Sequence, residues 1–113
     1  MSLPRYAELV TASHPAMRKL LDDHIDYYEE LLETLWLSEV ARWCSAHFVA
    51  GDIPAVQRVL DAMEQAWIVS AAGDRNTIAT GFVEHLPTTY APAGGIVTLL
   101  GPNLAAKHRE VRR

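Results

Sequence analysis

Acidic side chains are concentrated in one short stretch of the chain. Seven of the fourteen Asp and Glu residues lie between Asp22 and Glu39, and no Lys or Arg lies between Leu20 and Ala41. The seven are Asp22, Asp23, Asp26, Glu29, Glu30, Glu33 and Glu39. The formal net charge of −4 therefore describes one negative segment on a chain that is otherwise slightly basic. Carboxylates at this density can bind metal ions, act as acids and bases, or attract cationic partners.

A metal site would require ligands that converge from more than one structural element. His24 stands beside Asp23 and near Asp26, but carboxylates on one helix are spread along its axis. The Glu-x-x-His pairs of helical di-iron proteins and the His-Glu-x-x-His motif are both absent from the sequence. We therefore expect neither a metal ion nor a cofactor.

Catalytic arrangements are also incomplete. Cys44 and His47 are three residues apart, but a reactive thiolate needs an exposed, electropositive setting, and the neighbouring Trp43 predicts a core cysteine instead. Glu29 and Glu30 are adjacent on one predicted helix, so they cannot face each other across a glycosidic bond. We expect no enzymatic activity, and a small enzyme is retained only as a third hypothesis.

Capping residues and apolar spacing predict helices over most of the chain. The expected helices cover residues 2–12, 15–37, 38–51, 52–72, 74–86 and 103–113. Residues 88–95 read as a loop rich in Pro, Gly and Thr, and residues 99–102 as a short turn and a corner. No strand pattern is sustained anywhere. The sequence thus predicts an all-α fold, a single-domain orthogonal bundle of five or six helices over residues 1–113.

The predicted second helix carries two distinct stripes. The apolar stripe consists of Leu21, Ile25, Tyr28, Leu32, Leu35 and Trp36. The acidic stripe consists of Asp22, Asp26, Glu29 and Glu33, about 100° away around the helix axis. Tyr27 lies at their border, and the apolar register fails after Trp36, so a break is expected at residues 37–38. An unmixed acidic stripe is either a solvated face or a surface for a basic partner, and both interpretations stay open.

Composition narrows the classes of partner and compartment. A chain with a pI near 5.6 is poorly suited to direct nucleic-acid binding, which needs a cationic surface. No apolar run is long enough to cross a bilayer, and the first ten residues lack the pattern of a signal peptide. The single cysteine, Cys44, suits a reducing compartment. We expect a cytoplasmic protein with no membrane contact.

The order of several segments resembles a group of small helical bacterial domains of about a hundred residues. The segments are an acidic helix leading into ARW at residues 41–43, LDAMEQA at 60–66, GFVEHLP at 81–87 and LLGPNL at 99–104. Members of that group look like companions of polymorphic or contact-delivered toxins. The resemblance therefore implies an immunity protein, but it supplies no functional residue.

With the immunity role that the resemblance implies, we expect a non-enzymatic immunity (antitoxin) protein that binds and neutralises a cognate bacterial toxin domain. Toxins that act on nucleic acid tend to carry basic clefts, which an acidic helical face would complement. The predicted partner-binding residues are Asp22, Asp23, Asp26, Tyr27, Glu29, Glu30 and Glu33. The alternative is a homo-oligomeric helical adaptor or structural protein, possible as a homodimer, whose three Trp residues and apolar segment 53–67 would form a self-interface.

Overall fold

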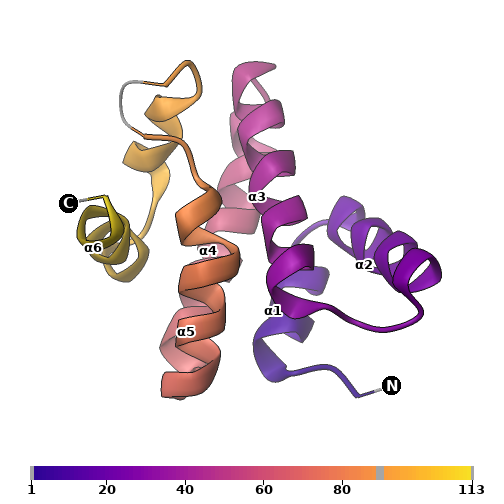
Figure 1. Cartoon of the computed structure of the whole chain (residues 1–113). Coiled ribbons are helices and arrows are strands. Elements are labelled where there is room, and N and C mark those ends of the chain that lie inside the picture. The colour runs from indigo at the N-terminus through magenta and orange to yellow at the C-terminus, as the bar shows by residue number, and fades with distance from the viewer. Residues whose placement is uncertain (1, 89–90, 113) are drawn as a thin grey trace.

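Residues 2–88 and 91–112 are described by the computed structural model, and they contain helices but no strand (Figure 1). The helices are α1 (Arg5–Ser13), α2 (Pro15–Tyr28), α3 (Glu33–Val49), α4 (Ile53–Val69), α5 (Ala72–Gly81), η1 (Val83–His85), η2 (Gly94–Leu99) and α6 (Pro102–Val111), where η denotes a 3-10 helix. The predicted all-α class is confirmed. None of the described helices is long and apolar enough to cross a membrane.

Four central helices pack in pairs and two helices flank them. α1 packs along α4, and α3 packs along α5. α2 contacts α1 and α3 at one edge of the molecule, whereas α6 contacts α4 and η1 at the opposite edge (Figure 1). α2, which carries three of the seven acids of the acidic segment, is therefore peripheral, and one of its sides is available to solvent.

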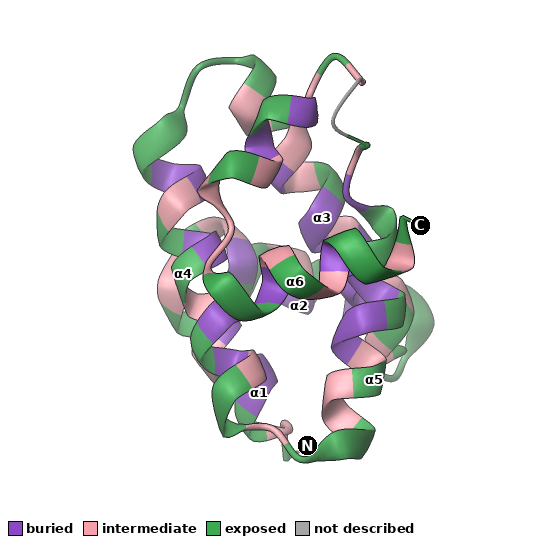
Figure 2. Ribbon diagram, turned by 90° about the vertical axis from the view of Figure 1, so that its left-hand side faces the viewer, coloured by how far each residue is buried: buried purple, intermediate pink, exposed green. Residues whose placement is uncertain are grey.

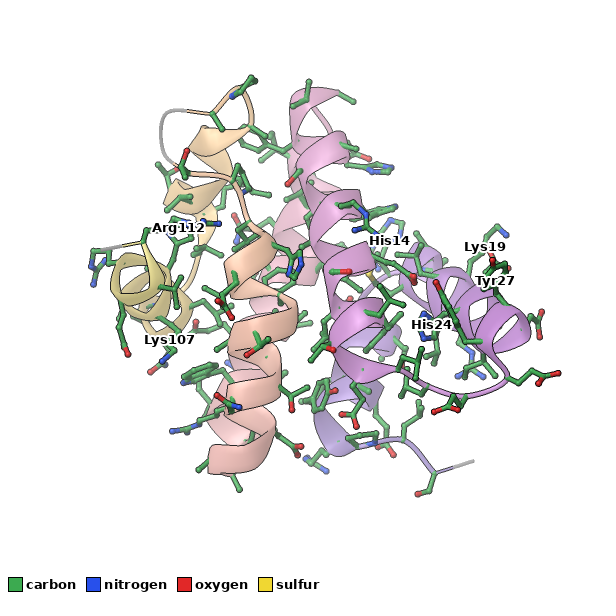
Figure 3. The ribbon with its side chains drawn as sticks, in the orientation of Figure 1. His14, Lys19, His24, Tyr27, Lys107 and Arg112 are labelled. Atoms are coloured by element: carbon green, nitrogen blue, oxygen red, sulfur yellow. The ribbon has the colours of Figure 1, made fainter. Side chains whose placement is uncertain are left out.

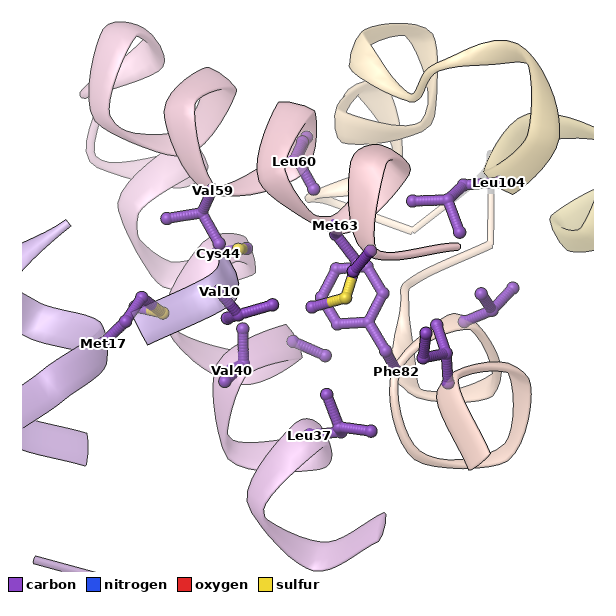
Figure 4. Close-up of a cluster of buried hydrophobic side chains, with 14 of the residues drawn as sticks. Val10, Met17, Leu37, Val40, Cys44, Val59, Leu60, Met63, Phe82 and Leu104 are labelled. Atoms are coloured by element: carbon purple, nitrogen blue, oxygen red, sulfur yellow. The ribbon is translucent and has the colours of Figure 1, made fainter. Parts of the chain in front are cut away.

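The core is built from the apolar stripes of these helices, which face inward (Figure 2). α4 contributes Val56, Val59, Leu60 and Met63, at the three- and four-residue spacing of one helix face. Val10, Met17, Val40, Cys44, Phe82 and Leu104 join the same cluster from the surrounding elements (Figure 4). Burying a large apolar side chain stabilises a fold by about 1.5–3 kcal/mol, so this cluster holds the helices together.

The break between the second and third helices lies earlier than the sequence predicted. α2 ends at Tyr28 and α3 begins at Glu33, so the expected helix over residues 15–37 and its break at residues 37–38 are wrong. Trp36, Leu37, Val40 and Cys44 form one continuous buried face of α3, which explains why the register changed. Ser38 does not cap a helix, because its hydroxyl donates to the carbonyl oxygen of Leu35 inside α3.

The start of α6 is held by a buried carboxylate from α4. Oε1 of Glu64 accepts from the Leu104 amide at 3.0 Å, and Oε2 accepts from the Asn103 amide at 3.0 Å. Gly101 precedes α6 and has no side chain with which to cap it. A Cβ atom at position 101 would lie 2.6 Å from Cδ of Glu64, so glycine is required for this approach. The segment LLGPNL is therefore a corner in which Glu64 replaces the missing cap.

Other helix boundaries also differ from the predicted ones. α1 begins at Arg5 and α6 at Pro102. α4 ends at Val69, and Gly73 lies inside α5 instead of separating two helices. The end of the predicted 88–95 loop, residues 94–95, lies in η2, and residues 89–90 lie outside the described residues. The Arg112 guanidinium near the chain end donates to the carbonyl oxygens of Glu84 and Leu86, so α6 is tied to η1.

Candidate partner-binding site

The first two predicted site residues, Asp22 and Asp23, have cationic neighbours one helical turn earlier on α2. Nε of Arg18 lies 3.3 Å from Oδ1 of Asp22, and Nζ of Lys19 lies 2.8 Å from Oδ2 of Asp23. The bond and charge of Asp23 raise the pKa of Lys19. All four side chains are largely exposed, and such pairs add little stability and exchange readily. The negative charge of this part of α2 is thus partly offset, which the acid count alone did not reveal.

Asp26, Glu29 and Glu30 form the uncompensated part of the acidic segment. All three are exposed, and none of them forms an ion pair within residues 2–88 and 91–112. Asp26 lies on α2, whereas Glu29 and Glu30 lie in the turn that follows. Because the chain turns at this point, the three carboxylates do not follow one straight helical stripe. We call Asp22, Asp23, Asp26, Glu29 and Glu30 the acidic face.

The turn places Glu29 in a conformation that a glutamate rarely adopts. Its φ is 63°, in the left-handed region, and its amide donates to the Ile25 carbonyl oxygen at 2.7 Å to end α2. Left-handed backbone costs a residue with a Cβ roughly 1–2 kcal/mol relative to glycine. A charged, strained residue therefore stands where glycine would be the favoured helix terminator.

Glu33 is separated from the acidic face. It is half-buried in the first turn of α3, and its carboxylate accepts the hydroxyl proton of Tyr6 on α1. Burial and this carboxylate raise the pKa of Tyr6 far above its ordinary value, so the phenol stays protonated and donates. The single stripe predicted for Asp22, Asp26, Glu29 and Glu33 is therefore wrong. Glu33 joins two helices, and its predicted contact with a partner is untested.

Glu39 and His24 form the main polar connection between α2 and α3. Nδ1 of His24 lies 2.9 Å from Oε1 of Glu39, and Nε2 accepts the amide of Leu32 at 3.1 Å. Since Nε2 accepts, Nδ1 carries the proton and donates it to Glu39, and the imidazole is neutral. His24 is fully buried here, whereas 22% of the Glu39 side chain is exposed. The carboxylate is thus fixed in place, and no positive charge on His24 cancels its negative charge.

A shallow hollow opens beside this pair. It has a volume of about 280 Å³ and is lined by Leu20, Asp23, His24, Tyr27, Tyr28 and Glu39. Tyr27 is 80% exposed, the most of any large apolar or aromatic side chain in the described residues. Lys19 and Tyr27 project from the outer edge of α2, and His24 lies on the side that faces α3 (Figure 3). The hollow therefore combines aromatic rings with two carboxylates.

The sequence missed this hollow because its residues come from two elements. The spacing of Leu20, Asp23, Tyr27 and Tyr28 on one helix was visible, but the contribution of Glu39 requires the turn at residues 29–32. The burial of the His24 ring was not predicted either. One signal was available: His24 lies three residues after Leu21 and four before Tyr28, which places it next to the apolar stripe on the helix.

Cys44 and His47, the other residues considered for catalysis, make contacts inside the fold. Cys44 is buried, as predicted, and burial raises the pKa of its thiol to about 12, which leaves it without nucleophilic thiolate at neutral pH. His47 stacks on Trp43 with ring centroids 4.0 Å apart and contacts the Trp43 carbonyl oxygen. In the described part of the chain, no three His, Cys, Asp or Glu side chains are grouped to hold a metal ion.

A family model described as a domain of unknown function, DUF7674, matches residues 7–113, nearly the whole chain. No curated protein and no solved structure matches the chain.

Proposed function

Because this chain belongs to the DUF7674 family, whose function is unknown, we propose its role from its own surface. We propose a non-enzymatic immunity protein that binds a cognate bacterial toxin domain in the cytoplasm and blocks it. The resemblance in segment order to companions of contact-delivered toxins supports the choice of partner.

The observation that carries the proposal is the exposure of charge and aromatic surface in one place. Asp26, Glu29 and Glu30 are exposed and form no ion pair with any described residue, and Tyr27 beside them is 80% exposed. Carboxylates that serve only solubility are ordinarily mixed with cations. Tyrosine is enriched at the energetic centres of interfaces. An acidic surface of this kind accelerates encounter with a basic partner and selects against acidic ones.

The mechanism follows from where the acidic face lies. α2 is peripheral and packs on α1 and α3 through one side only, so a partner can approach its outer side without disturbing the core. Toxin domains that cleave or modify nucleic acid need cationic clefts for phosphate binding. Carboxylates placed over such a cleft would occupy the positions of the phosphates. The rest of the bound immunity protein would block the nucleic acid from entering the cleft.

The alternative, a homo-oligomeric adaptor, remains a second proposal with less support. Of the three Trp residues expected at a self-interface, Trp36 is fully buried and Trp43 and Trp67 are half-buried. The apolar residues of α4 are largely used in the core. Near α4, the exposed large apolar side chains are divided between its two ends: Val49 and Ile53 lie near its start, and Ile68 and Val69 near its end.

Co-expression tests the immunity proposal. The toxin candidate is the C-terminal domain of any large secreted protein encoded beside the gene for this chain, produced under a tight promoter in cells with or without the chain. A locus without such a gene would count against the proposal. We expect growth arrest by the domain alone and restored growth with the chain. Arrest that persists despite a folded, abundant chain would contradict the proposal. Sedimentation of the chain alone tests the alternative, since a tight dimer favours self-association.

A further inference from the structure

The hollow between α2 and α3 has the chemistry of a receptor for a long cationic side chain. Leu20 and the rings of Tyr27 and Tyr28 supply apolar contact area, and Asp23 and Glu39 supply carboxylates. A volume of about 280 Å³ suits one side chain rather than a segment of polypeptide. Arginine and lysine are the natural side chains with an apolar stem and a cationic end.

The carboxylates leave this hollow negative. Glu39 is held by the Nδ1–H group of His24, which is neutral because its Nε2 accepts the Leu32 amide. Asp23 is contacted by Lys19 from the solvent side, but 77% of that lysine side chain is exposed and can swing away. Glu39 thus has no cationic partner among the described residues, and Lys19 can be displaced from Asp23.

The aromatic side chains are ordered before any ligand arrives. The ring of buried His24 lies 4.7 Å from the Tyr28 ring, centroid to centroid, and Tyr28 lies 4.7 Å from Tyr27 in an edge-on arrangement. This row leads from the core to the surface and holds Tyr27 beside the carboxylates. Preformed aromatic and charged groups reduce the entropy lost when a ligand binds.

We propose that this hollow receives an arginine side chain of the partner protein, with its stem on Leu20 and Tyr28 and its guanidinium between the Tyr27 ring and the Glu39 carboxylate. This inference rests on the proposed function, since it names the anchor of the same interface. Arginine fits better than lysine because its planar guanidinium stacks on aromatic rings, is weakly hydrated and pairs with carboxylates through two N–H groups.

An NMR titration of the intact, isotope-labelled chain tests the inference without the partner. The probe is N-acetyl-arginine-N-methylamide, and the control is the citrulline analogue, which has nearly the same shape but no charge. We expect saturable shifts at Tyr27, Tyr28, His24 and Glu39 with the arginine probe, at millimolar affinity, and no saturation with citrulline. The lysine analogue should bind about threefold more weakly.

Two variants and a matched control locate the binding. Tyr27→Ala removes an exposed ring, so the fold is retained, and it should weaken the arginine probe about threefold. Glu39→Gln keeps an acceptor for His24 and should weaken the probe about tenfold. Glu8→Gln removes an exposed acid on α1, outside the hollow, and should change nothing. The Tyr27→Ala result holds even if Glu39→Gln disturbs the α2–α3 contact.

Several results would overturn the inference. These are equal binding of citrulline, shifts confined to residues 26–30, undiminished binding in Tyr27→Ala, or a lysine analogue that binds as tightly as arginine. Failure here is separable from failure of the proposed function. A chain that fails to bind the arginine probe could still protect cells from the toxin domain. That result would refute the arginine site but not the immunity role.

Discussion

His24 and Glu39 are joined side chain to side chain across the turn between α2 and α3, with Nδ1 2.9 Å from Oε1. The second ring nitrogen of His24 accepts the amide of Leu32, the residue that precedes α3. One buried imidazole therefore orders the turn and fixes a carboxylate at the edge of the candidate site. The local fold and the site share this residue.

Replacing His24 should cost stability. His24→Ala leaves the Leu32 amide and the Glu39 carboxylate without their partner and opens a cavity, so the free energy of unfolding should fall by roughly 2–4 kcal/mol. His85→Ala, which removes an exposed histidine, should change it by less than about 0.5 kcal/mol. Urea unfolding followed by circular dichroism gives both values. Equal, small effects for the two variants would show that the His24 contacts are unimportant.

The Glu64 cap of α6 predicts a matched pair of effects. Glu64→Gln keeps the shape but weakens the bonds to the Asn103 and Leu104 amides, and should destabilise the chain by about 1–2 kcal/mol. Gly101→Ala should be at least as harmful, because its Cβ would clash with Glu64. Gly73→Ala is the control, since no atom lies within 4 Å of a Cβ there. Thermal unfolding of all three variants tests this close approach of Glu64 to Gly101. An unchanged melting temperature for Gly101→Ala would contradict it.

At alkaline pH, ionisation of the Cys44 thiol in the unfolded chain should lower the free energy of unfolding. Burial raises the pKa of its thiol from 9.0 to about 12, and the unfolded chain has the ordinary value. Below pH 9 the thiol is protonated in both states, so its contribution is intact. Between pH 9 and 12 only the unfolded state loses the proton, and the free energy of unfolding should fall by about 1.4 kcal/mol per pH unit.

The raised pKa of the Tyr6 phenol acts in the same direction at higher pH. Denaturant unfolding of the parent chain, Cys44→Ala and Tyr6→Phe across the alkaline range separates the two groups. Cys44→Ala should be less stable at neutral pH because it leaves a small cavity, but its stability should decline less above pH 9. Parallel declines in the parent chain and Cys44→Ala would show that the thiol makes no contribution.

Glu29 should be replaceable with a gain in stability. Glu29→Gly allows the left-handed backbone without a Cβ, so the free energy of unfolding should rise by up to about 1 kcal/mol. Glu29→Gln removes the same charge but keeps the Cβ, and should give no comparable gain. Chemical denaturation of the two variants separates the cost of the left-handed backbone at position 29 from the effect of removing the charge. Glycine no better than glutamine at this position would mean that the turn is unstrained.

The sequence predicted the helical class well because apolar spacing and prolines at helix starts are local signals. Pro15, Pro54 and Pro102 all lie in the first turn of a helix, as proline favours. The buried face of α4 also followed from spacing alone. The break after Tyr28 was missed because no glycine or proline marks it. Its support comes from His24, a tertiary contact that spacing cannot show.

The candidate site was predicted only in outline. An acid count identified the segment, but it could not show that Arg18 and Lys19 lie against Asp22 and Asp23 or that Glu33 is used by Tyr6. The Arg18 and Lys19 pairs span four residues within α2, so helical spacing could have predicted them. The bond between Tyr6 and Glu33 joins two helices, and spacing along one helix cannot show it. The exposed remainder is smaller and more localised than the segment of seven acids.

The rate at which the chain associates with a toxin domain identified by the co-expression test is the most direct test of the central claim. The variant Asp26→Lys, Glu29→Lys, Glu30→Lys reverses the uncompensated part of the acidic face. Its control reverses three exposed acids elsewhere, Glu8, Asp61 and Glu84, and so has the same net charge. Stopped-flow mixing from about 50 to 500 mM salt measures both variants and the parent chain.

We predict that the parent rate constant falls steeply with salt, and that the face variant associates at least about tenfold more slowly at low salt with little salt dependence. The control should stay within about threefold of the parent chain. A face variant that associates as fast as the parent chain, or a control that is slowed equally, would contradict the claim that these carboxylates meet the cations of a partner.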